Sequence, residues 1–248
     1  MPRPITIKQL AQQTLWRLSA AADARVAAQA RVYFKQDEDV SFFGVATPVV
    51  RRLERELYQQ IKSVWTVDEA RGYCDLLLRD RRQEARSVGI LLFARYHKLF
   101  APELIKDFET WLGGNLCNNW ALTDELATCV IALFLRRFPA ALPRVAAWTG
   151  AENLWLRRAA AVALVPLARK GEALEQAYAI ARRLFHYHED LIHKANGWLL
   201  REAGKADAAR LKTFLLKYGV QIPRTTVRYA IERFPAVERR ALLRQTRA

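Results

Sequence analysis

Two tryptophans and one aspartate have the types and spacing needed to bind a positively charged group. Trp120 and Asp124 are four residues apart, so in a helix both side chains project from one face. Trp198 follows Lys194 by the same interval in a later segment of similar pattern. Aromatic faces attract cations by about 0.5–2 kcal/mol each. The two indole rings and the carboxylate together predict an anionic, aromatic binding site for a cationic substrate. The alternative is a first-turn aspartate that stabilises the helix dipole beside a core tryptophan.

A weak internal repeat indicates how these residues are positioned. Polar residues that head similar apolar runs recur every 34–38 residues, a spacing that fits a helix, a turn and a second helix. The heads are Arg86, Asp124, Arg158, Lys194 and Arg228. In a stack of helix pairs, equivalent helices line one concave wall, so the heads are predicted to face one groove.

The basic residues of this pattern predict a polyanionic partner. The chain has 40 Lys and Arg against 25 Asp and Glu, a formal charge of +15 and a pI near 10.2, which favours nucleic acid over an anionic membrane surface. Four of the five heads are basic, and Arg157, Arg201 and Arg224 lie close to them in sequence. They predict a stripe that binds the phosphate backbone, with a solvated charged face as the alternative.

Local signals indicate helices throughout. Gly and Pro are few, no Asn-Gly or Asp-Gly turn is present, and residues 1–248 are interpreted as a single all-helical domain. Thr47 before Pro48 predicts an N-cap, and Thr66 with Glu69 predicts a capping box. Five further tryptophans lack a polar partner and are predicted to pack in the core; they are Trp16, Trp65, Trp111, Trp148 and Trp155.

Several classes of protein are not expected. No signal-peptide core and no membrane-spanning stretch are apparent, and an odd number of cysteines without metal spacing favours reduced thiols in the cytoplasm. His186, His188 and His193 are interpreted as exposed loop imidazoles rather than a metal site. Without a Walker loop, a dinucleotide fingerprint or a nucleophile elbow, we expect no metal and no cofactor.

An ordered set of segments resembles the AlkD-type DNA alkylation-repair glycosylases, which are built of HEAT-like helical repeats. The segments are Phe42 to Pro48 with Tyr33 upstream, Trp120 to Asp124, Asn153 to Arg158, Lys194 to Glu202 and, more weakly, Arg224 to Phe234. The resemblance extends over roughly residues 20–235. It implies a right-handed solenoid of antiparallel helix pairs with a concave basic groove.

The resemblance also implies a function. Members of that family remove cationic lesions such as 7-methylguanine and 3-methyladenine from double-stranded DNA, as monofunctional hydrolases of base excision repair. Trp120 and Trp198 match the family's groove tryptophans, Asp124 its catalytic carboxylate and Arg158 an arginine that grips the backbone. Tyr33 and Thr47 are expected at the DNA, and we expect a cytoplasmic monomer that associates with the nucleoid when bound to DNA.

Two departures from the family's pattern leave alternatives open. Ala121 stands where the family often has aspartate, and Ala46 where some members have a polar residue beside the lesion. A non-catalytic relative would bind distorted or branched DNA by stacking tryptophans on exposed bases. A protein scaffold would hold an acidic partner along its concave face.

Overall fold

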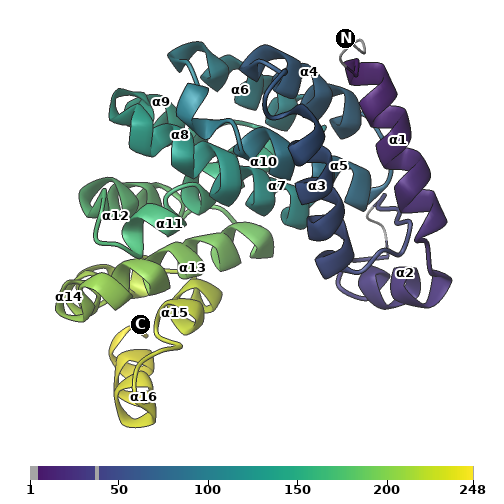
Figure 1. The fold of residues 1–248 in the computed structure, drawn as a ribbon. Coiled ribbons are helices and arrows are strands. Elements are labelled where there is room, and N and C mark those ends of the chain that lie inside the picture. The colour runs from purple at the N-terminus through teal and green to yellow at the C-terminus, as the bar shows by residue number, and fades with distance from the viewer. Residues whose placement is uncertain (1–4, 37–38, 248) are drawn as a thin grey trace. The chain divides into compact units, whose positions relative to one another are not determined.

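The computed structural model describes residues 5–36 and 39–247, and the regular secondary structure of these ranges is helical (Figure 1). Within them, the one β contact is an isolated parallel bridge between Ser41 and Arg82. The predicted all-helical class is therefore confirmed. Contacts between Cα atoms divide the chain into two compact units, Met1–Val130 and Ile131–Ala248. The single domain over residues 1–248 stays a prediction.

The first unit consists of α1 to α7 with two short 3₁₀ turns. The helices are α1 Ile7–Ala20, α2 Ala24–Arg31, α3 Thr47–Ile61, α4 Val67–Leu78, α5 Gln83–Ala94, α6 Ile105–Gly113 and α7 Trp120–Leu126, and the turns are His97–Leu99 and Pro102–Leu104. Helix α5 packs against α3, α4 and α7, and α1 packs against α3 and α4. Leu57, Tyr73, Phe93 and Trp111 are fully buried between them.

The second unit is organised around the long helix α13. A π-helical turn, Ala127–Ile131, spans the boundary between the units. The helices that follow are α8 Ala132–Arg137, α9 Leu142–Ala147, α10 Leu154–Val162, α11 Val165–Ala168, α12 Leu174–Arg183, α13 Asp190–Ala206, α14 Ala208–Tyr218, α15 Arg224–Ala230 and α16 Ala236–Gln245, with 3₁₀ turns at Pro139–Ala141, Trp148–Gly150 and Gly219–Gln221. Helix α13 packs against α10, α11, α12, α14 and α15.

A glycine permits a close contact between α13 and α15 in the second unit. A Cβ on Gly197 would lie 2.4 Å from the Cβ of Tyr229 and 2.8 Å from the carbonyl oxygen of Thr226. Because real Cβ atoms do not approach so closely, only glycine lets α13 and α15 pack at this distance.

The heads predicted from the sequence occupy nearly the same position in each of their helices. Each head is the fourth or fifth residue of its helix, in α5, α7, α10, α13 and α15 respectively. Side chains also bond across one repeat length: Gln83 to Asn119 and Arg71 to Asp107 in the first unit, and Arg136 to Glu172 in the second, each pair 36 residues apart. The helical-repeat fold is therefore confirmed within each unit.

Two local predictions are corrected. Thr47 is not an N-cap: α3 begins at Thr47 itself, and the extended residue before it, Ala46, caps the helix without a side-chain bond. Trp16 is 71% exposed rather than a core residue, whereas Trp65, Trp111 and Trp148 are buried. The capping box of Thr66 and Glu69 is confirmed.

A helix that spans a membrane needs about 20 consecutive, mostly apolar residues. In the described part of the chain, no single helix is long and apolar enough. The segments Trp120–Arg137 and Pro139–Gly150 meet the length and composition requirement as a pair, with a sharp bend between them.

Candidate functional site

The start of α7 is fixed from two sides. The side-chain oxygen of Asn119 accepts a hydrogen bond of 3.0 Å from the backbone N–H of Leu122, so Asn119 caps the helix. The amide nitrogen of Asn119 donates to Gln83 of α5, also at 3.0 Å. The hydroxyl of Thr123 donates to the carbonyl of Cys117 at 2.9 Å. These bonds hold the helix that carries Trp120 and Asp124 against α5.

Trp120 and Asp124 lie one helical turn apart, and both are half-buried. The indole of Trp120 stacks on the ring of Phe34, with 5.3 Å between centroids and 22° between planes. Phe34 in turn contacts Phe42, at 5.6 Å between centroids. Trp120 is thus oriented by aromatic packing, on the same helix as the predicted carboxylate.

A cavity of about 360 Å³ brings three of the predicted site residues together. Trp120, Tyr33 and Thr47 line it, and the last two side chains are exposed. Asp124 is not among the lining residues. The other residues that line the cavity are Val26, Ala30, Phe34, Phe42, Val45, Val50, Arg51, Gln83, Glu84, Ser87, Leu91, Ala121 and Glu125. The cavity lies wholly within the first unit, between α2, α3, α5 and α7.

One wall of this cavity is a backbone loop held by the buried carboxylate of Glu84. Its oxygens accept bonds from the backbone N–H groups of Phe43, Gly44 and Val45 at 2.8–3.0 Å. Gly44 has a φ of +83°, and a Cβ there would lie 1.9 Å from the carbonyl oxygen of Asp23. The loop therefore requires both the carboxylate and the glycine.

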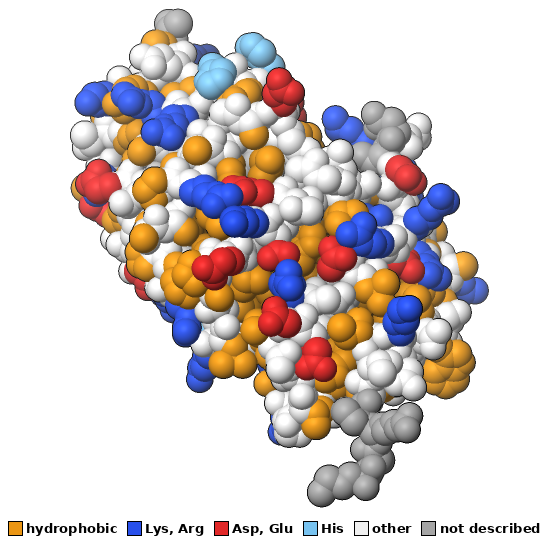
Figure 2. Space-filling model, turned by 90° about the horizontal axis from the view of Figure 1, so that it is seen from above, with side chains coloured by type: hydrophobic (Ala, Val, Ile, Leu, Met, Phe, Trp, Pro, Cys, Tyr) orange, Lys and Arg blue, Asp and Glu red, His pale blue; other side chains and the backbone are white. Residues whose placement is uncertain are grey.

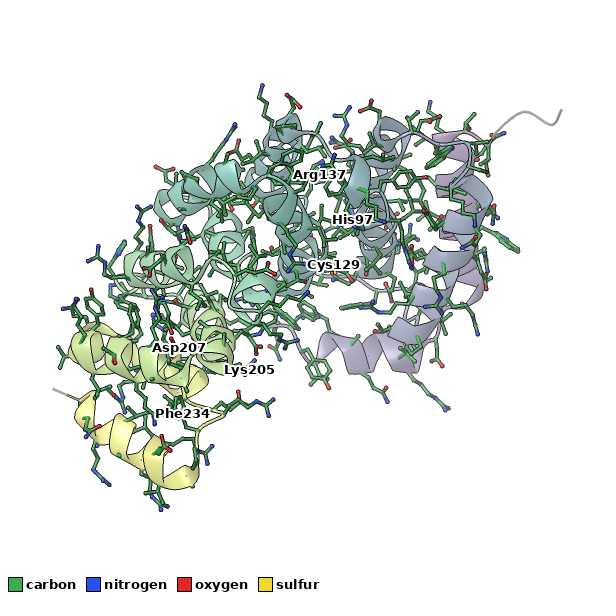
Figure 3. The ribbon with its side chains drawn as sticks, turned by 60° about the vertical axis from the view of Figure 1, so that its left-hand side comes forward. His97, Cys129, Arg137, Lys205, Asp207 and Phe234 are labelled. Carbon is green, nitrogen blue, oxygen red and sulfur yellow. The ribbon has the colours of Figure 1, made fainter. Side chains whose placement is uncertain are left out.

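Glu125, which the sequence pattern did not single out, has a carboxyl group whose pKa is raised. Its Oε2 accepts a 2.5 Å bond from the hydroxyl of Ser87. Burial raises the pKa of Glu125 to about 7, although the bond from Ser87 and the charge of Arg51 lower it. Cys129, labelled in Figure 3, follows four residues later, and burial raises the pKa of its thiol. A signal was available in the sequence, since Glu125 directly follows the head Asp124.

The predicted contact Arg86 is part of the packing between repeats. Its guanidinium donates to the side chain of Asn118 at 2.7 Å and to the carbonyl of Asp80. Burial lowers the pKa of Arg86 from its ordinary value. Arg86 thus bonds to the segment that precedes α7, and its contact with DNA stays a prediction.

In the second unit, Trp198 is half-buried on α13, and the two arginines of α10 are buried. Arg157 donates to the carbonyls of Ala151 and Glu152 at 2.8 and 2.6 Å, pairs with the carboxylate of Glu189 and lies 4.5 Å from the ring centroid of Tyr187. These contacts anchor the start of α10.

Arg158 also has contacts within the unit. It donates to the carbonyl of Leu191 at the start of α13. It is close enough to Lys194 for its charge to oppose the rise in the pKa of Lys194 that the bond to Asp190 causes. The structure thus places these two predicted DNA-binding residues near each other.

The remaining residues predicted to contact DNA differ in their exposure and in their bonds to other residues of the protein. Arg201 pairs with Glu202 and Glu232, and Arg224 donates to the side chain of Thr246 at 3.0 Å. Arg228 is exposed and lines a cavity with Arg224. Cationic and anionic side chains are interspersed on the face shown in Figure 2. Binding of DNA by each residue stays a prediction, and exposure favours Arg228.

Comparison with known proteins identifies the family of the chain and a solved structure of similar fold. The model of a family described as "DNA alkylation repair enzyme" matches residues 14–234, so the chain belongs to that family. No curated protein sequence matches it. The fold is similar to that of a solved structure described as "Predicted DNA alkylation repair enzyme from Enterococcus faecalis", with a TM-score of 0.76 and 18% identity, covering 87% of this chain and 97% of the other.

Proposed function

We propose that this protein is a DNA glycosylase that removes positively charged alkylated purines, of the 7-methylguanine and 3-methyladenine type, by hydrolysing the N-glycosidic bond. The observation that carries the proposal is the half-buried carboxylate of Asp124 one turn after Trp120, on a helix whose start is fixed by Asn119. Membership of a DNA alkylation repair family and a charge of +15 support the same function.

The chemistry follows from the charge of the lesion. An alkylated purine already carries a positive charge and leaves easily, so the protein must mainly stabilise the cationic sugar that forms as the bond breaks. The carboxylate of Asp124 stabilises that charge and orients the attacking water. The faces of Trp120 and Trp198 add cation–π attraction. No lysine Schiff base is needed, so the product is an abasic site in an uncut strand.

Binding of the substrate would use the basic side chains. Double-stranded DNA that contains the lesion is the proposed partner. Among the basic heads, Arg228 is exposed, and the side chain of Lys194 is 42% exposed. The protein would act as a cytoplasmic monomer, with no metal or cofactor in the reaction.

The test is release of 7-methylguanine from duplex DNA by the wild type and Asp124→Asn. We expect release above the spontaneous rate, and a loss of about 10²-fold or more in the variant, the usual effect of removing a group that stabilises the transition state. Glu103→Gln, which changes an exposed carboxylate of the first unit, is the matched control and should keep the wild-type rate. Binding of the duplex without any release would contradict the proposal and favour a non-catalytic DNA-binding protein.

A further inference from the structure

A cavity of about 620 Å³ in the second unit is lined by positive side chains. It lies between the loop before α13, the start of α15 and the residues that follow α16, wholly within this unit. Arg224, Arg228 and Arg247, called here the cavity arginines, line it together with His188 and His193. Among the residues that the structure describes, no Asp or Glu lines this cavity. The space is therefore suited to an anion.

The cavity arginines differ from several other predicted DNA contacts in their partners. Arg157, Arg201 and Lys194 each pair with a carboxylate of the same unit. Within residues 5–36 and 39–247, the cavity arginines form no such pair. Their positive charge is therefore not neutralised by a neighbouring carboxylate.

A second cavity of the unit shows how the same protein neutralises cations elsewhere. Its volume is about 400 Å³, and Lys205 and Phe234, both labelled in Figure 3, line it. Three of the cations in its lining pair with carboxylates; the pairs are Arg201–Glu232, Lys205–Glu202 and Lys212–Glu238. Basic residues around a cavity are thus not always left without a counter-charge in this unit.

Arg224 is held in place by bonds to the end of the chain that the structure describes. Its Nη1 donates to the hydroxyl of Thr246 at 3.0 Å, and its Nη2 donates to the carbonyl of Leu243 at 3.1 Å. Thr246 is almost fully buried, and its hydroxyl donates to the carbonyl of Leu242 at 2.7 Å. These bonds fix the guanidinium of Arg224 before any ligand binds, and they place Arg247 beside it.

The cavity arginines also lie close enough to affect one another. Burial lowers the pKa of Arg224, and the charges of Arg247 and Arg228 lower it further. The three guanidinium groups therefore repel one another, and an anion bound among them would remove that repulsion. Guanidinium groups match the geometry of phosphate oxygens, with which they form paired, charge-assisted hydrogen bonds.

The position of the cavity relates its ligand to DNA. Arg158, Lys194 and Arg228 are the heads of α10, α13 and α15, and α13 packs against both of the other helices. Arg158 and Lys194 lie near each other, as the effect of one charge on the pKa of the other indicates. The cavity therefore lies where this row of heads ends, at Arg228.

We propose that this cavity binds backbone phosphates of a DNA strand, with the guanidinium groups of Arg224, Arg228 and Arg247 as their donors. The inference rests on the proposed function, because DNA is the partner. It adds Arg247, which belongs to no repeat head, to the residues that contact DNA. The imidazoles of His188 and His193 offer further N–H donors to the same phosphates.

The first experiment measures binding of a short, fluorescently labelled duplex without a lesion, by anisotropy between 50 and 200 mM salt. Each phosphate that a cation neutralises contributes about 0.9 to the slope of log K against log salt concentration. Arg247→Ala should therefore reduce the magnitude of that slope by about 0.9 and weaken binding at 50 mM salt. Its Tm should not change, because Arg247 is exposed. A slope equal to that of the wild type would overturn the proposal.

Matched variants separate this site from the overall charge of the protein. Arg240→Ala removes the same charge from an exposed arginine of α16 that does not line the cavity, and it should keep the wild-type slope. Arg247→Lys keeps the charge and should restore most of the slope that Arg247→Ala loses. Equal losses in Arg240→Ala and Arg247→Ala would show a general effect of charge and would overturn the site.

Two further measurements distinguish the source of the phosphate and the role of the site. Calorimetric titration with inorganic phosphate at constant ionic strength should show no saturable binding tighter than about 1 mM. A tighter phosphate site that Arg247→Ala abolishes, with an unchanged DNA slope, would identify a free anion as the ligand and overturn the assignment to DNA. Release of 7-methylguanine by a protein whose DNA slope does not depend on Arg247 would overturn this inference while the glycosylase proposal stands. A slope that depends on Arg247 in a protein that excises nothing would support the site and overturn the proposed function.

Discussion

Replacing Glu125 by glutamine is expected to stabilise the protein at pH 8 and to leave its stability nearly unchanged at pH 4. The native carboxyl has a pKa raised to about 7 by burial, against an ordinary value of 4.5. Between these values the native state holds a proton that the unfolded state has lost, so the free energy of unfolding falls as pH rises from about 4.5 to about 7. Each pKa unit corresponds to about 1.4 kcal/mol, so the ionised native protein loses about 3 kcal/mol.

Thermal unfolding at the two pH values measures this difference. Glutamine can still accept the bond from Ser87 but is never charged, so Glu125→Gln avoids the loss. For a chain of this length, about 3 kcal/mol corresponds to a rise in Tm of roughly 6–12 °C at pH 8. Glu103→Gln should change Tm by no more than about 2 °C at either pH, since exposed substitutions have small effects. A Glu125→Gln protein that is less stable than the wild type at pH 8 would refute the reasoning.

Three further predictions concern the surroundings of the site. Glu84→Gln keeps one acceptor oxygen but turns an amide N–H toward the donors of the 43–45 loop, and should lower the free energy of unfolding by about 2–4 kcal/mol in urea titrations; a loss below 1 kcal/mol would contradict these bonds. Gly44→Ala should lower Tm, because its methyl group would overlap the carbonyl of Asp23; a fully stable variant would show that the φ of +83° is not required. Arg228→Ala should weaken DNA binding and reduce its salt dependence at unchanged Tm, because Arg228 is exposed. Arg157→Ala should mainly lower Tm, because Arg157 is buried among structural partners. Equal salt slopes in the wild type and Arg228→Ala would contradict a phosphate contact.

The repeat could be predicted from the sequence because its signals are local. Apolar periodicity and polar heads are set within single helices, so the heads occur at the fourth or fifth position of each helix, and the capping box of Thr66 and Glu69 forms as predicted. Thr47 was misassigned by one position because a threonine before a proline suits either the cap or the first turn. Helix caps are decided by backbone angles that the residue types only restrict.

Long-range partners could not be predicted from residue types. Arg157 and Arg86 look like DNA-binding arginines in the sequence, and their burial depends on partners such as Glu189 and Asn118, about 32 residues away. Glu125 was overlooked because an acidic residue in a helix is usually exposed. Its environment depends on Ser87 of α5 and on aromatic residues of the loop that follows α2, which are far from Glu125 in the sequence.

The bonds that join one repeat to the next also affect how the chain folds and unfolds. Partners such as Arg71 with Asp107 and Arg136 with Glu172 are one repeat apart, so each turn of the structure depends on its immediate neighbours. Such a chain behaves like a one-dimensional array in which order spreads from any repeat that forms first. Amide hydrogen exchange should therefore be fastest in the outermost helices and slowest in the interior ones, and a defect in one repeat should loosen its neighbours more than distant helices.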